Sequence, residues 1–237
     1  MTTTPEISFV IPIYNEQAIL HAAVVDLRER LAPHGLRYEI ILAENGSRDR
    51  TVEIARELCA RYPELRLEQS QTPNYGQALR QGIARARGEL VICEEIDLCD
   101  VDFHLAALRL LRGQEADFVV GSKLTSGARD ARPWLRHGAS VLYTSVLRVL
   151  FDFRGTDTHG LKAFRRELVL PLVQACRVER DMFASELLIR AYRAPLRVVE
   201  IPVRTVEKRP PSIDLWRRLP GVAKDLWQLT WSIRLKG

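Results

Sequence analysis

Long apolar runs are absent from this sequence of 237 residues. No stretch of eighteen consecutive apolar residues occurs, so a membrane-spanning helix is not expected. Residues 1–6 have neither a basic start nor an apolar run, and we expect no secretory signal. The four cysteines form no CxxC pair, and no histidine stands at zinc-ligand spacing. Buried free thiols in a reducing compartment are therefore the simplest expectation.

The composition is that of an ordinary globular protein, with 46% hydrophobic and 27% charged residues. This balance argues against disorder, collagen and coiled coil, and the length suits one or two domains. The net charge of +5 lies at the C-terminal end, where residues 204–237 hold eight basic and three acidic side chains. A basic tail favours an anionic partner. The tail is rich in Trp and Leu and carries no groove-reading motif, so we expect no nucleic-acid partner.

Apolar runs and amphipathic stretches alternate up to residue 122. This alternation predicts strands at residues 7–13, 38–43, 65–69, 90–94 and 117–121, and helices at residues 16–31, 49–62, 76–87 and 102–112. Short connections between strand and helix predict βαβ units, and hence an α/β fold with a mostly parallel central sheet flanked by helices. Ligands of such sheets bind at the carboxyl ends of the strands. Those ends are polar here, at residues 14–16, 44–47, 95–97 and 122–123.

The pattern changes after residue 122. A polar loop at 124–132 precedes a predicted helix at 133–151, and a short apolar run follows at 161–164. A helix at 181–192, a strand at 196–203 and a last helix after Pro210-Pro211 complete the chain. No linker is long enough to separate a second independent domain.

Four motifs occur in order: SFVIPIYNE (8–16), EIILAENGSRDRT (39–51), GQALRQGIARARGELVICEEIDLCD (76–100) and DFVVGSK (117–123). Their order and spacing resemble family-2 glycosyltransferases with the Rossmann-like GT-A fold. The segments DTHGLKAFRREL, DMFASELLIRAYR and VVEIPVRTVEKRPPS are similar to the polyprenyl-phosphate (dolichyl-phosphate mannose synthase-like) branch. The resemblance implies one GT-A domain at 1–212, with a nucleotide-sugar-binding half at 1–122, an acceptor half at 123–212, and a basic amphipathic tail at 213–237.

The resemblance also implies a site for a nucleotide-diphosphate sugar. The implied donor-binding residues are Pro12, Tyr14, Asn15, Glu16, Glu44, Asn45, Ser47, Gly76, Glu95 and Ile96. A divalent cation, Mg²⁺ or Mn²⁺, would bridge the two phosphates, with Glu95 and Asp97 as its ligands and Asp97 as a catalytic residue. Ser47 and Asp49 are explained equally well by an Asx turn and a helix N-cap.

Four positions depart from the family pattern. Glu95-Ile96-Asp97 stands where Asp-x-Asp is usual, and Glu44-Asn45 stands where two aspartates are usual. Cys99 replaces a common glutamine, and Asn74-Tyr75 replaces a basic or Gly-rich segment. Octahedral Mg²⁺ is strict about ligand geometry, so the longer Glu95 matters. An altered donor, altered metal use or lost activity all remain open.

Two acceptor chemistries remain open as well. A sugar hydroxyl needs a base, for which Asp181 and Glu186 are the candidates. A lipid phosphate is already an anion and needs cations instead. The candidate cations are Lys123, which matches the family's Gly-Ser-Arg/Lys strand end, and Arg129, Arg132 and Arg209. The acceptor loop contributes Asp157, His159 and Lys162.

Apolar residues in the tail recur at helical spacing. They are Leu215, Leu219, Val222, Leu226, Leu229 and Ile233, which form one face of a helix. Trp216, Trp227 and Trp231 are interleaved with basic residues. This composition fits a helix lying on an anionic membrane surface. A helix docked on the catalytic core, or on the partner in a homodimer, fits equally well.

These observations predict an inverting glycosyltransferase that moves a sugar from a nucleotide-diphosphate sugar to a polyprenyl phosphate or related acceptor. We expect it in the cytoplasm, either free or bound peripherally to the inner face of the cell membrane. One alternative is a catalytically impaired nucleotide-sugar-binding or scaffold protein on the same fold. Another is a soluble transferase that acts on a sugar, protein or metabolite hydroxyl.

Overall fold

A seven-stranded sheet forms the centre of the structure, a computed structural model that describes residues 4–123, 125, 129–130, 144–158, 160–179, 182–205 and 227–235. The strand order is β3-β2-β1-β4-β7-β5-β8. These strands are β1 (Ile7–Ile13), β2 (Tyr38–Asn45), β3 (Leu65–Ser70), β4 (Leu90–Cys93), β5 (Phe118–Ser122), β7 (Lys162–Arg165) and β8 (Val198–Pro202). Strand β7 is antiparallel to both neighbours, whereas the other pairs are parallel. The predicted α/β fold with a mostly parallel sheet is confirmed.

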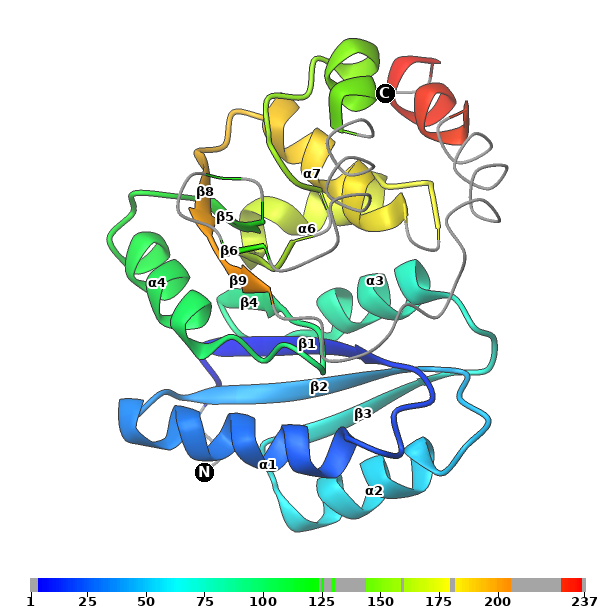
Figure 1. Cartoon of the computed structure of the whole chain (residues 1–237), viewed down its shortest axis with the longest axis vertical. Coiled ribbons are helices and arrows are strands. Elements are labelled where there is room, and N and C mark those ends of the chain that lie inside the picture. Colours follow the sequence, from blue (N-terminus) through cyan, green and yellow to red (C-terminus); the bar gives the residue numbers. More distant parts are fainter. Residues whose placement is uncertain are drawn as a thin grey trace.

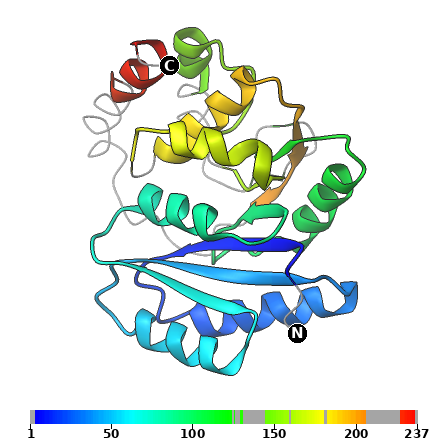
Figure 2. The ribbon, with the colours of Figure 1, turned by 180° about the vertical axis from the view of Figure 1, so that it is seen from behind.

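Helices cover both faces of the sheet. They are α1 (Leu20–Leu31), α2 (Thr51–Arg61), α3 (Tyr75–Arg85), α4 (Val101–Arg112), α6 (Arg166–Ala175) and α7 (Phe183–Arg193), with a short 3₁₀ turn η1 (Ala32–His34). Figure 1 shows α1 and α2 on one side of β1–β3 and α3 on the other, and Figure 2 shows the same layers from behind. A small parallel pair, β6 (Arg129–Asp130) with β9 (Arg204–Thr205), lies outside the main sheet.

The alternation of side chains along β1 explains the two layers. Phe9 and Ile11 are buried against α1, α2 and α4, whereas Val10 is buried in the cluster that includes α3, α6 and α7. Successive residues of a strand point to opposite faces, and both faces of β1 are apolar. Burying each large apolar side chain contributes roughly 1.5–3 kcal/mol. Helices on both faces are thus required to cover this sheet.

Helix α6 was not expected from the sequence. It contains Pro171, and an interior proline usually ends a helix because it lacks an N–H and its ring crowds the preceding turn. Here the apolar residues Val169 and Val173 are buried, which keeps the helix on the sheet despite the proline. Of the predicted helix at 133–151, residues 144–151 are helical, and the rest lies outside the described residues.

Strand β7 needs a glycine where it enters the sheet. A Cβ at Gly160 would lie 1.7 Å from the carbonyl oxygen of Gly121, so only glycine fits there. The Gly121 N–H donates to the carbonyl of Leu161 at 2.8 Å. This close approach of two backbones places Lys162, the first residue of β7, beside the end of β4.

The C-terminal helical segment 227–235 packs on α7. Leu229 and Ile233 belong to the same apolar cluster as Leu187 and Leu188 of α7. Figures 1 and 2 both show this segment next to the helical residues 144–151. Among the described residues, no helix is both long enough and apolar enough to cross a membrane.

We predict that Asp117→Asn destabilises the protein in a pH-dependent manner. Asp117 is 6% exposed and accepts hydrogen bonds from Arg197 through its backbone N–H (2.9 Å), Nε (2.9 Å) and Nη2 (2.6 Å), which ties β5 to β8. Hydrogen bonds from Arg197 hold the pKa of Asp117 below its ordinary 3.8, although partial burial acts in the opposite direction. Replacing the ionised Asp117 carboxylate by a neutral amide lowers the free energy of unfolding by about 1–3 kcal/mol at neutral pH.

The pH dependence follows from the lowered pKa. The ionised carboxylate stabilises the folded state above the ordinary pKa, and this contribution is lost as the pH falls through the folded-state pKa. In urea unfolding, the difference between wild type and Asp117→Asn should therefore be constant from about pH 6 to 8 and shrink below about pH 4. A difference that stays constant down to pH 3 would contradict the assigned ion pair.

Candidate active site

A cleft of about 440 Å³ opens at the carboxyl ends of β1, β2 and β4. This volume lies in the range of small-molecule sites. The residues that line it are Pro12, Ile13, Tyr14, Glu16, Asn45, Tyr75, Glu95, Ile96, Asp97, Lys162 and Ala184. Most of the predicted donor residues and both predicted metal ligands are among them. The cleft also takes in one predicted acceptor residue, Lys162.

The loops after β1 and β2 are joined by side-chain to backbone hydrogen bonds. Ser47 Oγ accepts the N–H of Asn15 at 3.0 Å, and Asn15 Oδ1 accepts the N–H of Arg48 at 2.9 Å. The buried Glu44 carboxylate accepts the N–H of Ser47. Asn15, Glu44 and Ser47 do not line the cleft; they shape the loops that do. Asp49 also acts within these loops and accepts the N–H of Thr51 at 3.0 Å.

Asn45 connects the cleft to the start of α3. Its Oδ1 accepts the N–H of Asn74, and Asn74 Oδ1 accepts the N–H of Gln77 at 3.1 Å as the N-cap of α3. Asn74 Nδ2 donates to Glu179 Oε2 at 2.8 Å, across to the turn that precedes α7. The predicted donor residue Gly76 is buried in the first turn of α3 and does not line the cleft. Its neighbour Tyr75 does so instead.

Glu95 and Asp97 follow β4 and face the same cleft. Burial raises the pKa of the Glu95 carboxyl to about 7; the charges of Asp97 and Glu94 raise it further, and those of Lys123 and Lys162 oppose the rise. Ile96 lies between the two acidic residues and is 5% exposed within the apolar cluster of α1 and α4. Packing of Ile96 in this cluster holds the backbone between the two carboxylates against the core.

Lys162 brings a buried cation to the cleft. It is 3% exposed, and its Nζ donates to the carbonyls of Thr158 at 3.0 Å and Gly160 at 2.7 Å. Burial lowers its pKa, while the charges of Cys93, Asp157 and Glu95 act in the opposite direction.

Lys123 and Asp157 lie close to each other, since the Lys123 N–H donates to Asp157 Oδ2 at 3.4 Å. Neither residue lines the cleft itself. Lys123 is near enough to Glu95 to lower the pKa of that carboxyl.

The predicted base Glu186 does not fit that role. Its carboxylate is fully buried and accepts the backbone N–H groups of Arg177 (2.9 Å) and Val178 (2.7 Å). It also accepts Arg190 Nη2 at 2.8 Å and Ser232 Oγ at 2.6 Å. Both oxygens are therefore occupied, and neither reaches solvent. Glu186 instead joins α7 to the turn before it and to the C-terminal helical segment.

Several predicted acceptor-side residues cannot be placed. Asp181, His159, Arg132 and Arg209 lie outside the described residues. Arg129 belongs to β6, and only its backbone is described. Their roles remain predictions.

The profile of Glycosyl transferase family 2 matches residues 8–170, more than half of the chain. The chain belongs to this family. The matched region runs from the second residue of β1 through β7 and contains the cleft-lining residues named above apart from Ala184.

Curated relatives include proteins named as undecaprenyl-phosphate and dolichyl-phosphate sugar transferases. The chain is 32% identical to "Glycosyltransferase AglD" of Haloferax volcanii over 95% of this chain and 38% of that protein. It is 30% identical to an undecaprenyl-phosphate 4-deoxy-4-formamido-L-arabinose transferase of Edwardsiella ictaluri, over 85% and 60%. It is 27% identical to the dolichyl-phosphate beta-glucosyltransferase of Saccharomyces cerevisiae, over 93% and 72%. The chain thus spans less than two thirds of the length of the first two.

Solved structures confirm the GT-A fold. Glucosyl-3-phosphoglycerate synthase from Mycobacterium tuberculosis, in complex with Mn²⁺, UDP and phosphoglyceric acid, superposes with a TM-score of 0.71 at 20% identity, over 96% of this chain and 78% of that one. The mannosyltransferase PcManGT from Pyrobaculum calidifontis, in complex with GDP-Man and Mn²⁺, gives 0.62 at 21%, over 96% and 64%.

The residues of the cleft fit a divalent cation such as these neighbours hold. Two carboxylates, Glu95 and Asp97, face one cleft. Mg²⁺ and Mn²⁺ bind oxygen ligands and are often held by one or two carboxylates together with substrate phosphates. A cation beside Glu95 would also favour its ionised form, which burial alone disfavours. Among the described residues, no group of three or more His, Cys, Asp or Glu side chains is arranged around one point.

Sequence reasoning missed some residues at this site. Tyr75 and Ala184 line the cleft, although neither of them was assigned a role in binding from the sequence. Glu200 anchors the segment before β7 by accepting the N–H of Thr156 at 2.8 Å. In the sequence Glu200 stands within a predicted strand, two residues before Pro202, and nothing in that position indicates this role. Glu94 and His104 are separated by ten positions and meet only through the packing of α4 on the sheet.

We predict that Glu186→Gln and Ser232→Ala lower the stability of the family-2 domain without blocking donor binding. The first change removes an ionic acceptor and costs about 2 kcal/mol. The second removes two hydrogen bonds, one donated by Ser232 Oγ to Glu186 and one accepted from Arg190 Nη2, and also costs about 2 kcal/mol. Urea unfolding measures both, and calorimetry measures nucleotide binding. Unchanged stability together with lost turnover in Glu186→Gln would restore the base role.

Proposed function

We propose that this chain is a glycosyltransferase domain that moves a sugar from a nucleotide-diphosphate sugar to a polyprenyl phosphate, with inversion at the anomeric carbon. The observation that carries the proposal is the cleft in which Glu95 and Asp97 face a buried cation, Lys162. Such a cleft suits a diphosphate and a second phosphate. The names of the curated relatives support a lipid phosphate as acceptor.

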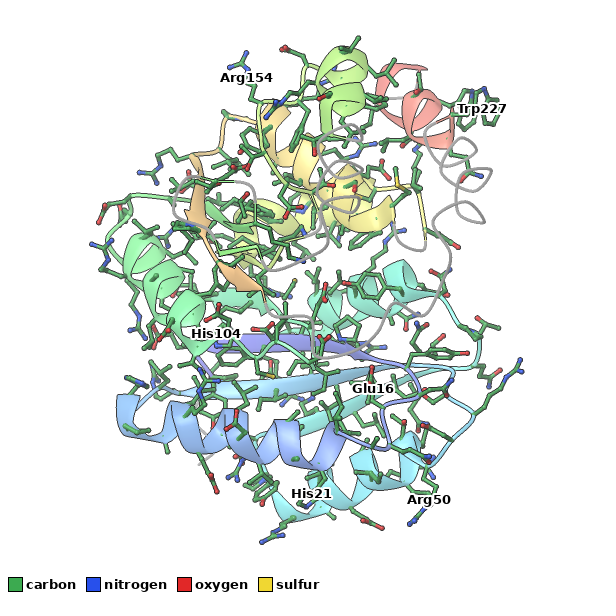
Figure 3. All side chains as sticks on the ribbon, in the orientation of Figure 1. Glu16, His21, Arg50, His104, Arg154 and Trp227 are labelled. Atoms are coloured by element: carbon green, nitrogen blue, oxygen red, sulfur yellow. The ribbon has the colours of Figure 1, made fainter. Side chains whose placement is uncertain are left out.

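The donor side of the cleft is made by β1, β2 and α3. Pro12, Tyr14, Glu16 and Asn45 supply an apolar surface and hydrogen-bonding groups for the base and ribose. Figure 3 shows Glu16 in the region where the loop after β1 leaves the sheet. Glu95 and Asp97 would hold Mg²⁺ or Mn²⁺, which neutralises charge on the diphosphate when bound.

The acceptor chemistry follows from the charges available. A phosphate oxygen of the acceptor attacks the anomeric carbon from the side opposite the nucleoside diphosphate. A new C–O bond forms while the C–O bond to the diphosphate breaks, and the diphosphate leaves with the electron pair. The attacking phosphate is already an anion, so no base has to remove a proton. Lys162 and Lys123 offset the negative charge that gathers between the two phosphates.

The catalytic role is tested by nucleoside diphosphate release. Purified protein is incubated with a panel of UDP- and GDP-sugars, undecaprenyl or dolichyl phosphate, and either Mg²⁺ or Mn²⁺. We expect release of UDP or GDP with at least one combination, and a loss of about a hundredfold or more in Asp97→Asn. Asp102→Asn, an exposed carboxylate in the first turn of α4, is the matched control and should retain the rate.

Two outcomes would count against this role. No release with any donor under either metal contradicts the proposed transfer. Metal-independent nucleotide binding without turnover supports the alternative of a non-catalytic nucleotide-sugar-binding protein.

We further propose that the C-terminal helical segment rests on an anionic membrane surface at the cytoplasmic face. Trp227 is 69% exposed and Trp231 is 41% exposed, while Leu229 and Ile233 are buried on α7. Figure 3 shows Trp227 pointing away from the rest of the chain. Val149, on the neighbouring residues 144–151, is 81% exposed. Tryptophan favours the interface between lipid and water, and the basic residues of the tail favour anionic lipid.

We predict that replacing both Trp227 and Trp231 by Ala weakens binding to vesicles. In sedimentation with vesicles of phosphatidylglycerol and phosphatidylcholine, the affinity should fall by about tenfold or more, since each 1.4 kcal/mol is a factor of ten. Leu168→Ala, an exposed apolar residue on α6, serves as control. Equal vesicle binding by the double variant and the wild type would contradict the proposal.

A further inference from the structure

Glu94 is a buried carboxylate at the end of β4 that the proposed reaction does not use. It is 2% exposed. Its Oε1 accepts the N–H of Glu95 at 2.8 Å, and its Oε2 accepts the N–H of Asp100 at 3.1 Å. These two amides stand at the two ends of the turn 95–100. One side chain thus closes the turn that carries Glu95 and Asp97.

His104 completes the arrangement from α4. The ring is fully buried, and its Nε2 is hydrogen-bonded to Glu94 Oε2. The ring also packs on Phe9 of β1, with centroids 4.9 Å apart. Figure 3 places His104 at α4, over the sheet. The hydrogen bond at Nε2 and the contact with Phe9 together fix the orientation of the ring.

The remaining nitrogen of His104 adds no stability to the pair. Nδ1 is buried and has no hydrogen-bond partner among the described residues. A buried polar atom without a partner costs stability, and an apolar pair of the same size would avoid that cost. The pair is therefore better explained by what it holds in place.

The turn itself needs such support. Cys99 has φ of 44°, a left-handed conformation that is unfavourable for a residue with a side chain. Arg30 Nη1 donates to the Cys99 carbonyl at 3.0 Å, and Asp100 caps α4 by accepting the N–H of Phe103 at 3.1 Å. The amides of Glu95 and Asp100 have Glu94 as their acceptor. Removing that acceptor would release both ends of a strained turn.

We infer that Glu94 and His104 are a positioning pair that sets the affinity of the Glu95-Ile96-Asp97 turn for a divalent cation. This inference rests on the proposed function, in which Glu95 and Asp97 hold the cation. Neither Glu94 nor His104 touches the cation or the substrate. They act through the backbone of the turn, which directs the two ligands into the cleft. Hydrogen-bond partners of metal ligands commonly change metal affinity by about 10- to 100-fold.

Three variants test the pair. Glu94→Gln places an amide N–H₂ against a backbone N–H, so one of the two backbone bonds is lost. His104→Phe keeps the ring on Phe9 and removes the donor at Nε2. His104→Gln can supply an N–H near the position of Nε2, and it should restore much of what His104→Phe loses.

Glu39→Gln is the matched control. Glu39 is 4% exposed at the opposite end of the sheet, and it accepts Ser8 Oγ at 2.7 Å and the N–H of Arg87 at 2.7 Å. It is a buried carboxylate with a backbone partner, like Glu94, but it is remote from the cleft. A loss of stability alone should therefore be similar in Glu39→Gln and Glu94→Gln.

The measured quantity is the Mn²⁺ concentration at which UDP or GDP gives half of its maximal increase in the melting temperature. We expect this concentration to rise by about tenfold or more in Glu94→Gln and His104→Phe, with nucleotide binding in EDTA unchanged. It should stay at the wild-type value in Glu39→Gln. Wild-type Mn²⁺ dependence in both Glu94→Gln and His104→Phe overturns the inference.

Amide hydrogen exchange separates this inference from the proposed function. The amides of Glu95 and Asp100 should exchange faster in Glu94→Gln than in Glu39→Gln, with or without metal. Unchanged exchange overturns the positioning role even if the wild type binds Mn²⁺. A wild type whose nucleotide binding ignores Mn²⁺ contradicts the metal site of the proposed function, and with it the cation affinity assigned to the pair.

Discussion

The parallel hydrogen bonding of β1 with β2 and β4 is the constraint on which the site depends. Ile13 pairs with Glu44, and Val10 pairs with Cys93, so all three strands end at one edge of the sheet. The loops that follow the three strands therefore lie together at that end of the sheet. Helices cover both faces of these strands, so this end is the part of the sheet left open to a ligand. The convergence of polar residues is thus a consequence of strand direction and burial.

Several carboxylates come close together at this end of the sheet, and their surroundings are not all alike. Glu44 and Glu94 are buried but accept backbone N–H groups. Glu95 differs: burial raises its pKa to about 7, and the nearby cations Lys123 and Lys162 oppose the rise. Glu44 and Glu94, whose charges are stabilised by backbone N–H groups, support the loops. Glu95 faces the cleft, where a bound cation or the charges of a substrate would favour its ionised form.

The strand and helix pattern up to residue 122 was predictable because apolar periodicity determines it locally. The residues at the strand ends could be named for the same reason. Helix α6 was missed because Pro171 contradicts the local signal and only packing of the helix against the sheet overrides it. Strand β7 was recognised as an apolar run, but its antiparallel place between β4 and β5 is a long-range property. The pairing of Glu94 with His104 likewise cannot be read from the sequence, since it depends on how α4 packs on the sheet.

Glu186 is a candidate base in the sequence, but in the structure its carboxylate connects separate segments through hydrogen bonds. It binds the C-terminal helical segment through Ser232 and the turn at 177–178 through two amides. The next residue of that turn, Glu179, accepts a hydrogen bond from the side chain of Asn74. The backbone N–H of Asn74 in turn donates to Asn45, which lines the cleft. Hydrogen bonds therefore run from the segment that carries the exposed tryptophans to the donor side of the cleft. If the acceptor is a lipid phosphate, as we propose, these contacts would hold the segment with the exposed tryptophans at a fixed distance from the sugar donor in the cleft.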